Sequence, residues 1–522
     1  MRVLLVTGRD AEESVRKHAH GGDHACTVLP LPRSVAALLT PSFIASQLRR
    51  GTWEAYDLIL TPGLMAGDVT PIEEATGVPT YKGPRYAADI PTVLTAIPEL
   101  RLSKTVPADT LQRKAVWKDA LRELEALAKR EPHAPQEEAV RIGTLQVGGD
   151  APVRVMAEIV DAPRLPDDEV VAAARHYLDS GADIIDVGME SLKAHPETVE
   201  RIVRLVKQAV DVPICLDTMD AGAAEAGVQA GADMLLSVDA GNMREFAAFA
   251  ADVVVGVLPS NQRLGVFPKS PAERIRALEH NIEDAKALGM THIVADPVLL
   301  SVPDLTESFV AYREFARRNP TTPLLMGIGN VTELMDADSI GVNALLAGIA
   351  GEHGVAILLT TEASSKTRGS VRETVQAAMM MRLARARGTP PKDLGVDLLV
   401  LKDKVWREEP VTARSLADAP VISARPTASF ISDAAGNFEI ALDRVRGDII
   451  ALHYKRAGDR VDLTLKGKSA VTLYKAMARH GLVSSVEHAA YFGYELGKAE
   501  MALITGKAYL QDEVLFHRET WA

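Results

Sequence analysis

The stretch GADIIDVGMES, residues 181–191, combines the pattern of a buried strand with acidic side chains. Only Asp186 interrupts the apolar run Ile184, Ile185 and Val187, whereas a strand with one solvated face would alternate apolar with polar residues. The pattern is typical of a parallel strand that is covered on both faces. Because α/β folds keep their chemistry at the carboxyl ends of such strands, the acids here are candidate site residues.

The same order of strand, turn and helix recurs through the middle of the chain. Eight apolar segments separated by helix-like stretches match the rhythm of a (β/α)8 TIM barrel. The expected strands are residues 154–160, 183–188, 213–218, 234–239, 252–258, 292–297, 323–329 and 356–362. A doubly wound open sheet is the alternative, but its glycine fingerprint is missing, because Thr332 stands where the last glycine after GIGN (327–330) should fall.

We expect three domains and the α/β fold class. Residues 1–135 hold strand-then-glycine patterns and a charged linker helix, which predict a small α/β domain of flavodoxin-like layout. The TIM barrel should span residues 145–390. Residues 395–522 combine strand-like with helical segments and predict an α+β domain.

The composition bounds the class of protein. Of the 522 residues, 47% are apolar and 25% charged, which is typical of a globular protein with ample cores. The net charge of -12 argues against bulk affinity for nucleic acid or an anionic membrane. Cys26 and Cys215 lie far apart in the sequence and indicate a reducing compartment. With neither a signal-peptide pattern nor a membrane-spanning apolar run, we expect a cytoplasmic protein.

Two motifs invite a functional interpretation that their spacing does not support. KHAHGGDHAC (17–26) gathers three histidines and a cysteine, but matches no standard zinc spacing, so a loop is expected. GKS (467–469) would need a glycine where Asp462 stands in order to wrap a phosphate, so we expect a turn before a helix.

Polar residues end or follow most of the expected barrel strands. They are Asp186, Glu190, Asp217, Ser237, Asp239, Asp296, Asn330 and Glu362. Since the carboxyl ends of barrel strands converge, we expect these side chains to meet at one mouth. So many carboxylates and amides suit a ligand rich in N–H donors. Asp217 and Asp296 are the strongest candidates, because each ends an apolar strand without a cationic neighbour in sequence.

Four motifs in this order resemble the pterin-binding TIM-barrel superfamily, which includes dihydropteroate synthases and methyltetrahydrofolate methyltransferases. They are GADIIDVGMES, VPICLDT, GADMLLSVDAGN and VADPVLL, and the resemblance covers about residues 150–385. With its flanking domains, the chain most resembles the dihydropteroate synthase-related proteins of organisms that make tetrahydromethanopterin. The resemblance implies that Asp217 and Asp296 bind the pterin ring and act in catalysis, together with a pterin site at Asp186, Ser237 and Asn330. A carboxylate pairs two-pronged with the 2-amino group and the N3–H of a pterin.

The chain also departs from dihydropteroate synthases. Their strand-one loop Asn-Val-Thr-Pro-Asp-Ser-Phe is replaced by IVDAPRL (159–165), and their Ser-Thr-Arg-Pro after strand two by SLKAHP (191–196). The lysine that follows their strand seven falls on Val331. Asn330 instead resembles the methyltransferase branch, in which an asparagine hydrogen-bonds the pterin.

Other groups are expected around the pterin site. SSKTRGSVRE (364–373) lies where TIM barrels bind phosphate, which makes Ser364, Ser365, Lys366 and Arg368 candidate phosphate ligands. A solvated turn that only caps the next helix is the alternative. The expected arylamine side consists of Glu190, Ser191 and Lys193. We expect Mg²⁺ as a cofactor, with Asp161 as its candidate ligand.

Three functions remain open. The first is a transferase that joins a hydroxymethyl-dihydropterin diphosphate to an arylamine, which the resemblance implies to be β-ribofuranosylaminobenzene 5′-phosphate in tetrahydromethanopterin biosynthesis. The second is a methyl-tetrahydropterin-dependent methyltransferase with a separate corrinoid protein, since the Asp-x-His-x-x-Gly corrinoid signature is absent at all 13 histidines. The third is a non-catalytic pterin-binding scaffold. Apart from a pterin and the phosphorylated arylamine, we expect no nucleic acid or membrane partner, but a possible homodimer.

Overall fold

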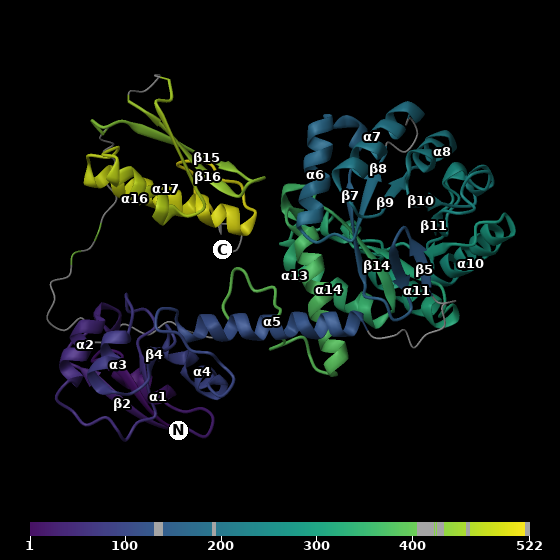
Figure 1. Cartoon of the computed structure of the whole chain (residues 1–522). Helices are drawn as coiled ribbons and strands as arrows, with labels where there is room; N and C mark the ends of the chain where they lie inside the picture. Colours follow the sequence, from purple (N-terminus) through teal and green to yellow (C-terminus); the bar gives the residue numbers. More distant parts are fainter. Residues whose placement is uncertain are drawn as a thin grey trace. The chain divides into compact units, whose positions relative to one another are not determined.

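The computed structural model describes residues 1–129, 139–189, 195–404, 422, 424, 433–455 and 460–516 (Figure 1). The chain divides into two compact units, one of Met1–Glu125 with Asp393–Arg425 and one of Ala126–Lys392 with Pro426–Ala522. Across these described ranges, no helix combines the length and the apolar character that crossing a membrane would require.

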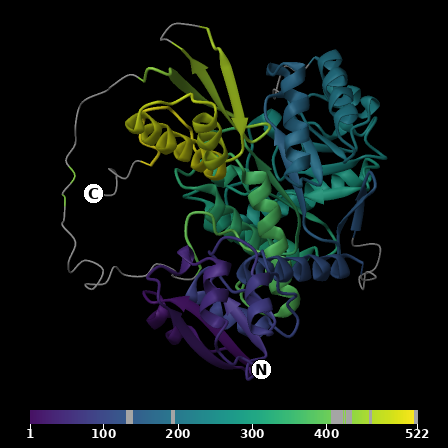
Figure 2. The ribbon, with the colours of Figure 1, turned by 60° about the vertical axis from the view of Figure 1, so that its left-hand side comes forward.

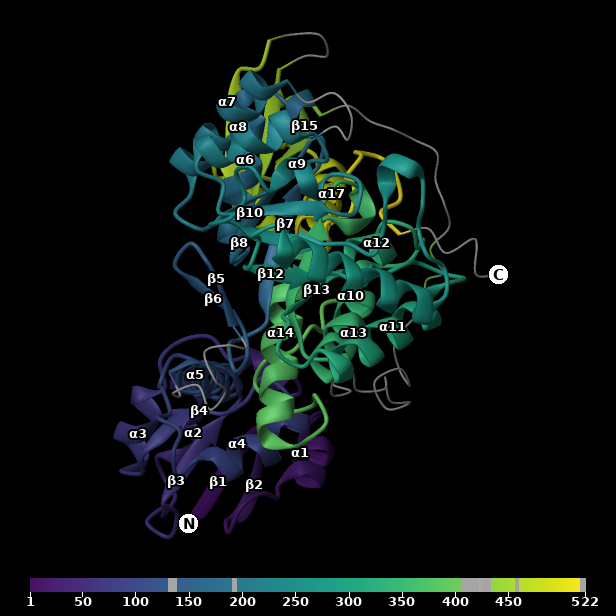
Figure 3. The ribbon, with the colours of Figure 1, turned by 90° about the vertical axis from the view of Figure 1, so that its right-hand side faces the viewer.

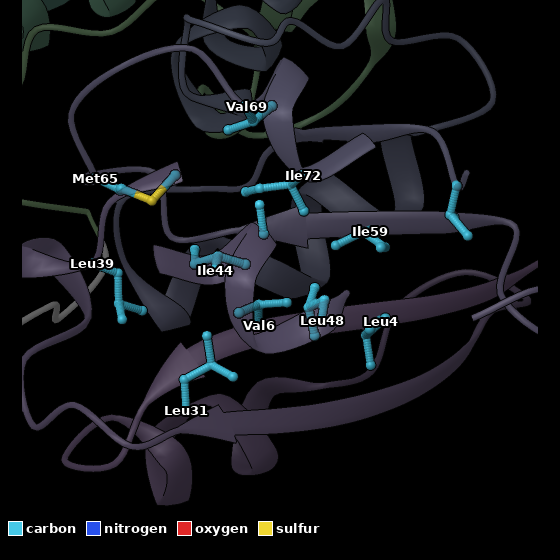
Figure 4. Close-up of a cluster of buried hydrophobic side chains, with 12 residues drawn as sticks. Leu4, Val6, Leu31, Leu39, Ile44, Leu48, Ile59, Met65, Val69 and Ile72 are labelled. Atoms are coloured by element: carbon cyan, nitrogen blue, oxygen red, sulfur yellow. The ribbon is translucent and has the colours of Figure 1, made fainter. Parts of the chain in front are cut away.

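The first unit is built on a parallel sheet with the strand order β2-β1-β3-β4. Its strands are β1 (Arg2–Gly8), β2 (Ala25–Leu31), β3 (Leu58–Thr61) and β4 (Thr80–Lys82), and its helices are α1 (Glu12–His18), α2 (Pro41–Leu48), α3 (Thr70–Thr76), α4 (Ile90–Ala96) and α5 (Ala108–Ala128). Successive residues of β1 point to opposite faces, so Val3 and Leu5 enter one core while Leu4 and Val6 enter the other. Figure 4 shows the second core. The unit is an α/β domain, and its flavodoxin-like layout stays a prediction.

The middle of the chain forms a closed barrel of eight parallel strands, which confirms the predicted TIM barrel. The strands are β7 (Arg154–Ile159), β8 (Ile184–Gly188), β9 (Ile214–Asp217), β10 (Met234–Val238), β11 (Val254–Val257), β12 (Ile293–Ala295), β13 (Leu324–Gly327) and β14 (Val355–Thr361). The barrel's α-helices are α6 (Asp167–Asp179), α7 (Pro196–Ala209), α8 (Ala221–Ala230), α9 (Met243–Phe246), α10 (Pro271–Ala287), α11 (Leu305–Arg318), α12 (Gly329–Thr332), α13 (Ser339–Glu352) and α14 (Ser370–Arg387). Their strand-helix alternation places the longer helices around the sheet.

The barrel interior is an apolar core that is closed at its amino-terminal end. Each strand sends alternate residues inward, among them Met156, Ile184 and Cys215. Figure 3 shows the hairpin of β5 (Ala139–Ile142) and β6 (Leu145–Gly148). Its Ile142 and Val147 belong to the same core. A residue two positions after an inward-facing one also faces inward, nearer the carboxyl end. This rule directs acidic side chains of several strands into the mouth of the barrel.

The last part of the chain combines an antiparallel sheet with two helices. The strands β15 (Asn437–Asp443), β16 (Asp448–Tyr454) and β17 (Leu463–Gly467) pair in that order. Helices α16 (Ala470–Arg479) and α17 (Val486–Thr505) lie along one face of the sheet (Figure 2) and pack on it through Leu473 and Phe492. The GKS segment leads into α16, with Ser469 at the N-cap position.

Candidate functional site

Three neighbouring barrel strands carry acidic side chains at their carboxyl ends. Glu158 on β7 is in register with Asp186 on β8, and Gly188 on β8 is in register with Asp217 on β9. Asp296 directly follows β12 on the other side of the mouth and is close enough for the charge of Asp217 to raise its pKa. The barrel therefore gathers four acids at one end, which include Asp186, Asp217 and Asp296 as expected from the sequence.

Ser237 reaches the mouth because the backbone of β10 leaves the regular pleat. Met234 and Leu236 face inward, so regular alternation would turn Ser237 outward. Instead, the register of β10 with β11 shifts between Leu235 and Val238, and Ser237 adopts a left-handed conformation with φ 65°. Its hydroxyl hydrogen-bonds the Asp217 carboxyl and lowers the pKa of that group, against the larger upward effect of burial.

Asp296 is held in place by two donors that act on the same oxygen. Its Oδ1 accepts hydrogen bonds from the backbone N–H of Val298 at 2.7 Å and from the Tyr312 hydroxyl at 2.7 Å. Among the described residues, Oδ2 accepts none. Burial raises the pKa of Asp296 to about 6, while these bonds and the Arg274 guanidinium oppose the rise. At neutral pH, the side chain is thus mainly a carboxylate with one oxygen left for a ligand.

Arg274 of α10 supports the loop that carries Asp296. Its fully buried guanidinium donates to the Val298 carbonyl at 3.0 Å and to the Ser308 hydroxyl at 3.2 Å. Val298 has a φ of 68°, a left-handed conformation that a β-branched residue rarely adopts. Asp296 binds its N–H and Arg274 binds its carbonyl, so this strained turn is fixed from both sides.

Asp186 is fully buried, and neither of its oxygens accepts a hydrogen bond of normal geometry. The nearby Cys215 thiol is a weak donor and stabilises the carboxylate only slightly. Burial, followed by the charges of Asp217 and Glu158, raises the pKa of Asp186 well above its usual range. A carboxylate in such surroundings is costly, so they favour the protonated form of Asp186.

Glu158 is the member of the acid cluster that the sequence analysis missed. Burial, and then the charges of Asp217, Asp161 and Glu333, raise its pKa to about 7. The available signal was an acid inside the apolar strand RVMAEIV, two residues after an inward-facing methionine. Its neighbourhood with Asp186 and Asp217 depends on strand register, which the sequence does not reveal.

Asn330 lies at the rim of the mouth, after β13. Its amide nitrogen donates to the Leu299 carbonyl at 3.0 Å, which ties the segment after β13 to the loop after β12. The side chain is exposed. The amide oxygen of Asn330 can therefore add an acceptor to the acidic mouth.

Two residues expected at the mouth take structural roles instead. Asp239 is fully buried and accepts hydrogen bonds from the Gly241 N–H, the Ser260 hydroxyl and the Gln262 N–H, so it fixes the loops after β10 and β11. Glu362 accepts from the Val371 N–H in the first turn of α14, and its other oxygen lies 3.1 Å from Nε2 of His176 in α6. Donors of the surrounding loops and helices thus engage both carboxylates, and a role for either in binding a ligand stays a prediction.

The expected phosphate segment is tied to its surroundings at several points. The Ser364 N–H and the Thr367 hydroxyl both donate to Glu333, and Lys366 forms an ion pair with Asp336 at 2.9 Å. Arg368 donates to the Gly506 carbonyl at 3.0 Å, and Ser365 is exposed. Because Glu362 already accepts from the first turn of α14, a phosphate here would have to use Ser365, Lys366 and Arg368. Phosphate binding stays a prediction.

The remaining site predictions concern the arylamine side and the metal. Glu190, Ser191 and Lys193 lie outside the described residues. Asp161 pairs with Arg164 at 3.2 Å, and in the described part of the chain no three His, Cys, Asp or Glu side chains are grouped to hold a metal ion. Mg²⁺ therefore stays a prediction, and the protein side chains described here do not by themselves form its site.

Three family models match separate parts of the chain, and one relative matches nearly its whole length. The model of the pterin binding enzyme family matches residues 161–359, a family of unknown function (DUF6513) matches residues 1–85, and PterinBD-DUF4346 matches residues 432–512. Uncharacterized protein MJ0107 of Methanocaldococcus jannaschii is 38% identical over 533 residues, covering 99% of both chains. A dihydropteroate synthase of Clostridium beijerinckii is 35% identical over 77 residues, covering 13% of this chain and 29% of its own.

Solved structures of dihydropteroate synthases are also similar. The enzyme from Xanthomonas albilineans in complex with 7,8-dihydropteroate is 20% identical with a TM-score of 0.40, covering 48% of this chain and all of that one. The Yersinia pestis enzyme is 20% identical with a TM-score of 0.38, covering 48% of this chain and 99% of its own.

Proposed function

The chain belongs to the pterin-binding TIM-barrel superfamily, and we propose that it is a pterin-utilising transferase. Within the superfamily it is a dihydropteroate synthase-related protein, of the same family as the Methanocaldococcus relative. It condenses a hydroxymethyl-dihydropterin diphosphate with a phosphorylated arylamine. The class of arylamine expected from the sequence, a ribosylated aminobenzene phosphate of tetrahydromethanopterin biosynthesis, is part of this proposal.

The observation that carries the proposal is that Asp217 and Asp296 lie near each other at the mouth. The Asp296 carboxylate has one oxygen that is not engaged by the described residues, and Asp217 is oriented by Ser237. A pterin carries N–H donors along one edge, and such edges pair with carboxylates by charge-assisted hydrogen bonds. Each of these bonds contributes about 1.5–3 kcal/mol to binding.

The charge distribution around Asp296 supports a role in the reaction as well as in binding. Tyr312 and Arg274 favour the ionised form of Asp296 in surroundings that otherwise oppose it. A carboxylate fixed beside the ring stabilises positive charge that develops on the pterin as the diphosphate leaves. The C–O bond to the diphosphate breaks, the C–N bond to the arylamine forms, and the amine nitrogen loses a proton.

One observation favours a second candidate function. Asn330 is exposed at the rim and is tied to the loop that follows Asp296. An asparagine can accept a hydrogen bond from a protonated pterin nitrogen, which suits methyl transfer from a methyl-tetrahydropterin. The methyl group would then pass to a separate corrinoid protein.

Diphosphate release tests the transferase directly. The full-length protein is incubated with the dihydropterin diphosphate and the ribosylated arylamine phosphate, and diphosphate is measured for the wild type, Asp217→Asn, Asp296→Asn and the control Asp211→Asn, an exposed acid before β9. We expect turnover in the wild type and the control and its loss in the two site variants. Pterin binding without turnover would favour the scaffold, and methyl transfer to a corrinoid would favour the methyltransferase.

A further inference from the structure

We propose that Glu158 is a further functional residue of the pterin site, and that its carboxyl takes up a proton when a pterin binds beside Asp217. The inference rests on the proposed function, because it names a role within the same site. It concerns binding and requires no covalent step. The proton passes from the solvent to a carboxylate oxygen of Glu158.

The space that Glu158 occupies is provided by a glycine on the next strand. A Cβ placed on Gly188 would lie 2.6 Å from Oε1 of Glu158, closer than such atoms can approach. Gly188 is in register with Asp217, so the Glu158 carboxyl reaches over β8 towards β9. Of the charges that raise the pKa of Glu158, that of Asp217 is the largest. The strand geometry thus brings the two acids together without a side chain between them.

The charged groups that act on the pKa of Glu158 are all acidic, and the neutral Tyr177 hydroxyl of α6 and Cys215 thiol of β9 are the other titratable groups near it. Asp186 lies on β8, Asp217 on β9, Asp161 follows β7, and Glu333 follows α12. On its other side, Glu158 is in register with the uncharged Thr361 of β14. None of the causes that shift the pKa of Glu158 is a described basic side chain. A second negative charge in this cluster is therefore opposed both by desolvation and by its neighbours.

Asp186 is independent evidence that the cluster is built to hold protons. It is fully buried, faces the barrel interior in register with Glu158, and neither of its oxygens accepts a hydrogen bond of normal geometry. Burial favours the protonated forms of Asp186 and Asp217 as well, so the three neighbouring acids compete for negative charge. The pKa of Glu158, about 7, places its titration in the physiological range.

A bound pterin strengthens both causes that raise the pKa of Glu158, namely desolvation and the negative charge of Asp217. The flat ring excludes water from the mouth, and its N–H donors fix a negative charge on Asp217. Both effects disfavour a carboxylate on Glu158, so its pKa is higher in the complex than in the free protein. Above a pH of about 7, binding must then be accompanied by proton uptake, and affinity falls by up to tenfold for each further pH unit.

Calorimetry of pterin binding tests the proton uptake. The full-length protein is titrated with 6-hydroxymethyl-7,8-dihydropterin from pH 7.0 to 8.5 in buffers of different ionisation enthalpy. We expect uptake of up to one proton and a falling affinity for the wild type and for Glu225→Gln, an exposed control on α8. Glu158→Gln should bind the pterin with neither effect. Since the ligand is the same, its own titration cancels in the comparison.

The outcomes separate this inference from the proposed function. Pterin binding without proton uptake in the wild type, or with equal uptake in Glu158→Gln, overturns the role of Glu158 and leaves the pterin site intact. No pterin binding by the wild type overturns both. Gly188→Ala, which displaces the Glu158 carboxyl, is the second variant in case Glu158→Gln does not fold. It should also reduce the proton uptake.

Discussion

Replacing Glu158 by glutamine should make the barrel more stable at alkaline pH. The pKa of Glu158 is raised from 4.5 to about 7, so between these values the folded barrel keeps a proton that the unfolded chain has lost. Under these conditions, the free energy of unfolding falls as pH rises, by 1.4 kcal/mol per pH unit and per proton. Over the whole window the cost of Glu158 amounts to about 3 kcal/mol. Glutamine keeps the size of the side chain and removes this cost.

The stability difference can be measured on the barrel itself. Urea-dependent hydrogen exchange, followed by mass spectrometry of peptides from β7 and β8, gives the free energy of opening for these strands. We expect wild type and Glu158→Gln to be nearly equal at pH 5, and the variant to be more stable by up to about 3 kcal/mol at pH 8. A difference that does not depend on pH would refute the reasoning, because it would show that Glu158 titrates in the folded barrel as it does in the unfolded chain.

Four further outcomes follow from the same geometry. Asp296→Asn should weaken pterin binding by about 10- to 150-fold, the effect of one charge-assisted hydrogen bond, as measured by calorimetry; a change below threefold would exclude Asp296 from the site. Tyr312→Phe removes a bond that lowers the pKa of Asp296, so pterin affinity should fall most between pH 6 and 7 and recover above it; a uniform loss at all pH values would contradict this. Arg274→Met frees the Val298 carbonyl and should lower the free energy of unfolding by about 2–4 kcal/mol in urea denaturation; an unchanged midpoint would show that the guanidinium does not support the loop. Gly188→Ala should lower the free energy of unfolding in the wild type, but much less in the Glu158→Ala variant. An equal loss in the two backgrounds would mean that the glycine is not needed to make room for the Glu158 side chain.

The barrel could be predicted from the sequence because its signal is local. Each buried strand, such as residues 184–188, is a short apolar run that needs no knowledge of its neighbours. Asp217 and Asp296 could be singled out for the same reason, since each stands at the end of such a run. The superfamily resemblance then supplied the expected ligand.

What could not be predicted depends on residues that meet only in the folded chain. Glu158 is inconspicuous in its own strand, and its neighbours are set by register. Tyr312 and Arg274 act on the loop of Asp296 from two helices. Tyr312 is 16 residues away in sequence from Asp296, and Arg274 is 24 residues away from Val298. Glu362 has the same position after a strand as the site acids, but the helix that follows it offers free N–H groups, which bind its carboxylate.

The hairpin β5–β6 has a kinetic consequence if the barrel takes the two substrates proposed above. With Ile142 and Val147 seated in the apolar core, the described residues fill the barrel on the amino-terminal side of the acids. A pterin that binds deep beside Asp217 would then have to arrive before an arylamine that binds nearer the solvent. Under the proposed chemistry, this imposes a compulsory order of addition, so that the arylamine should gain measurable affinity only once the deeper partner is in place.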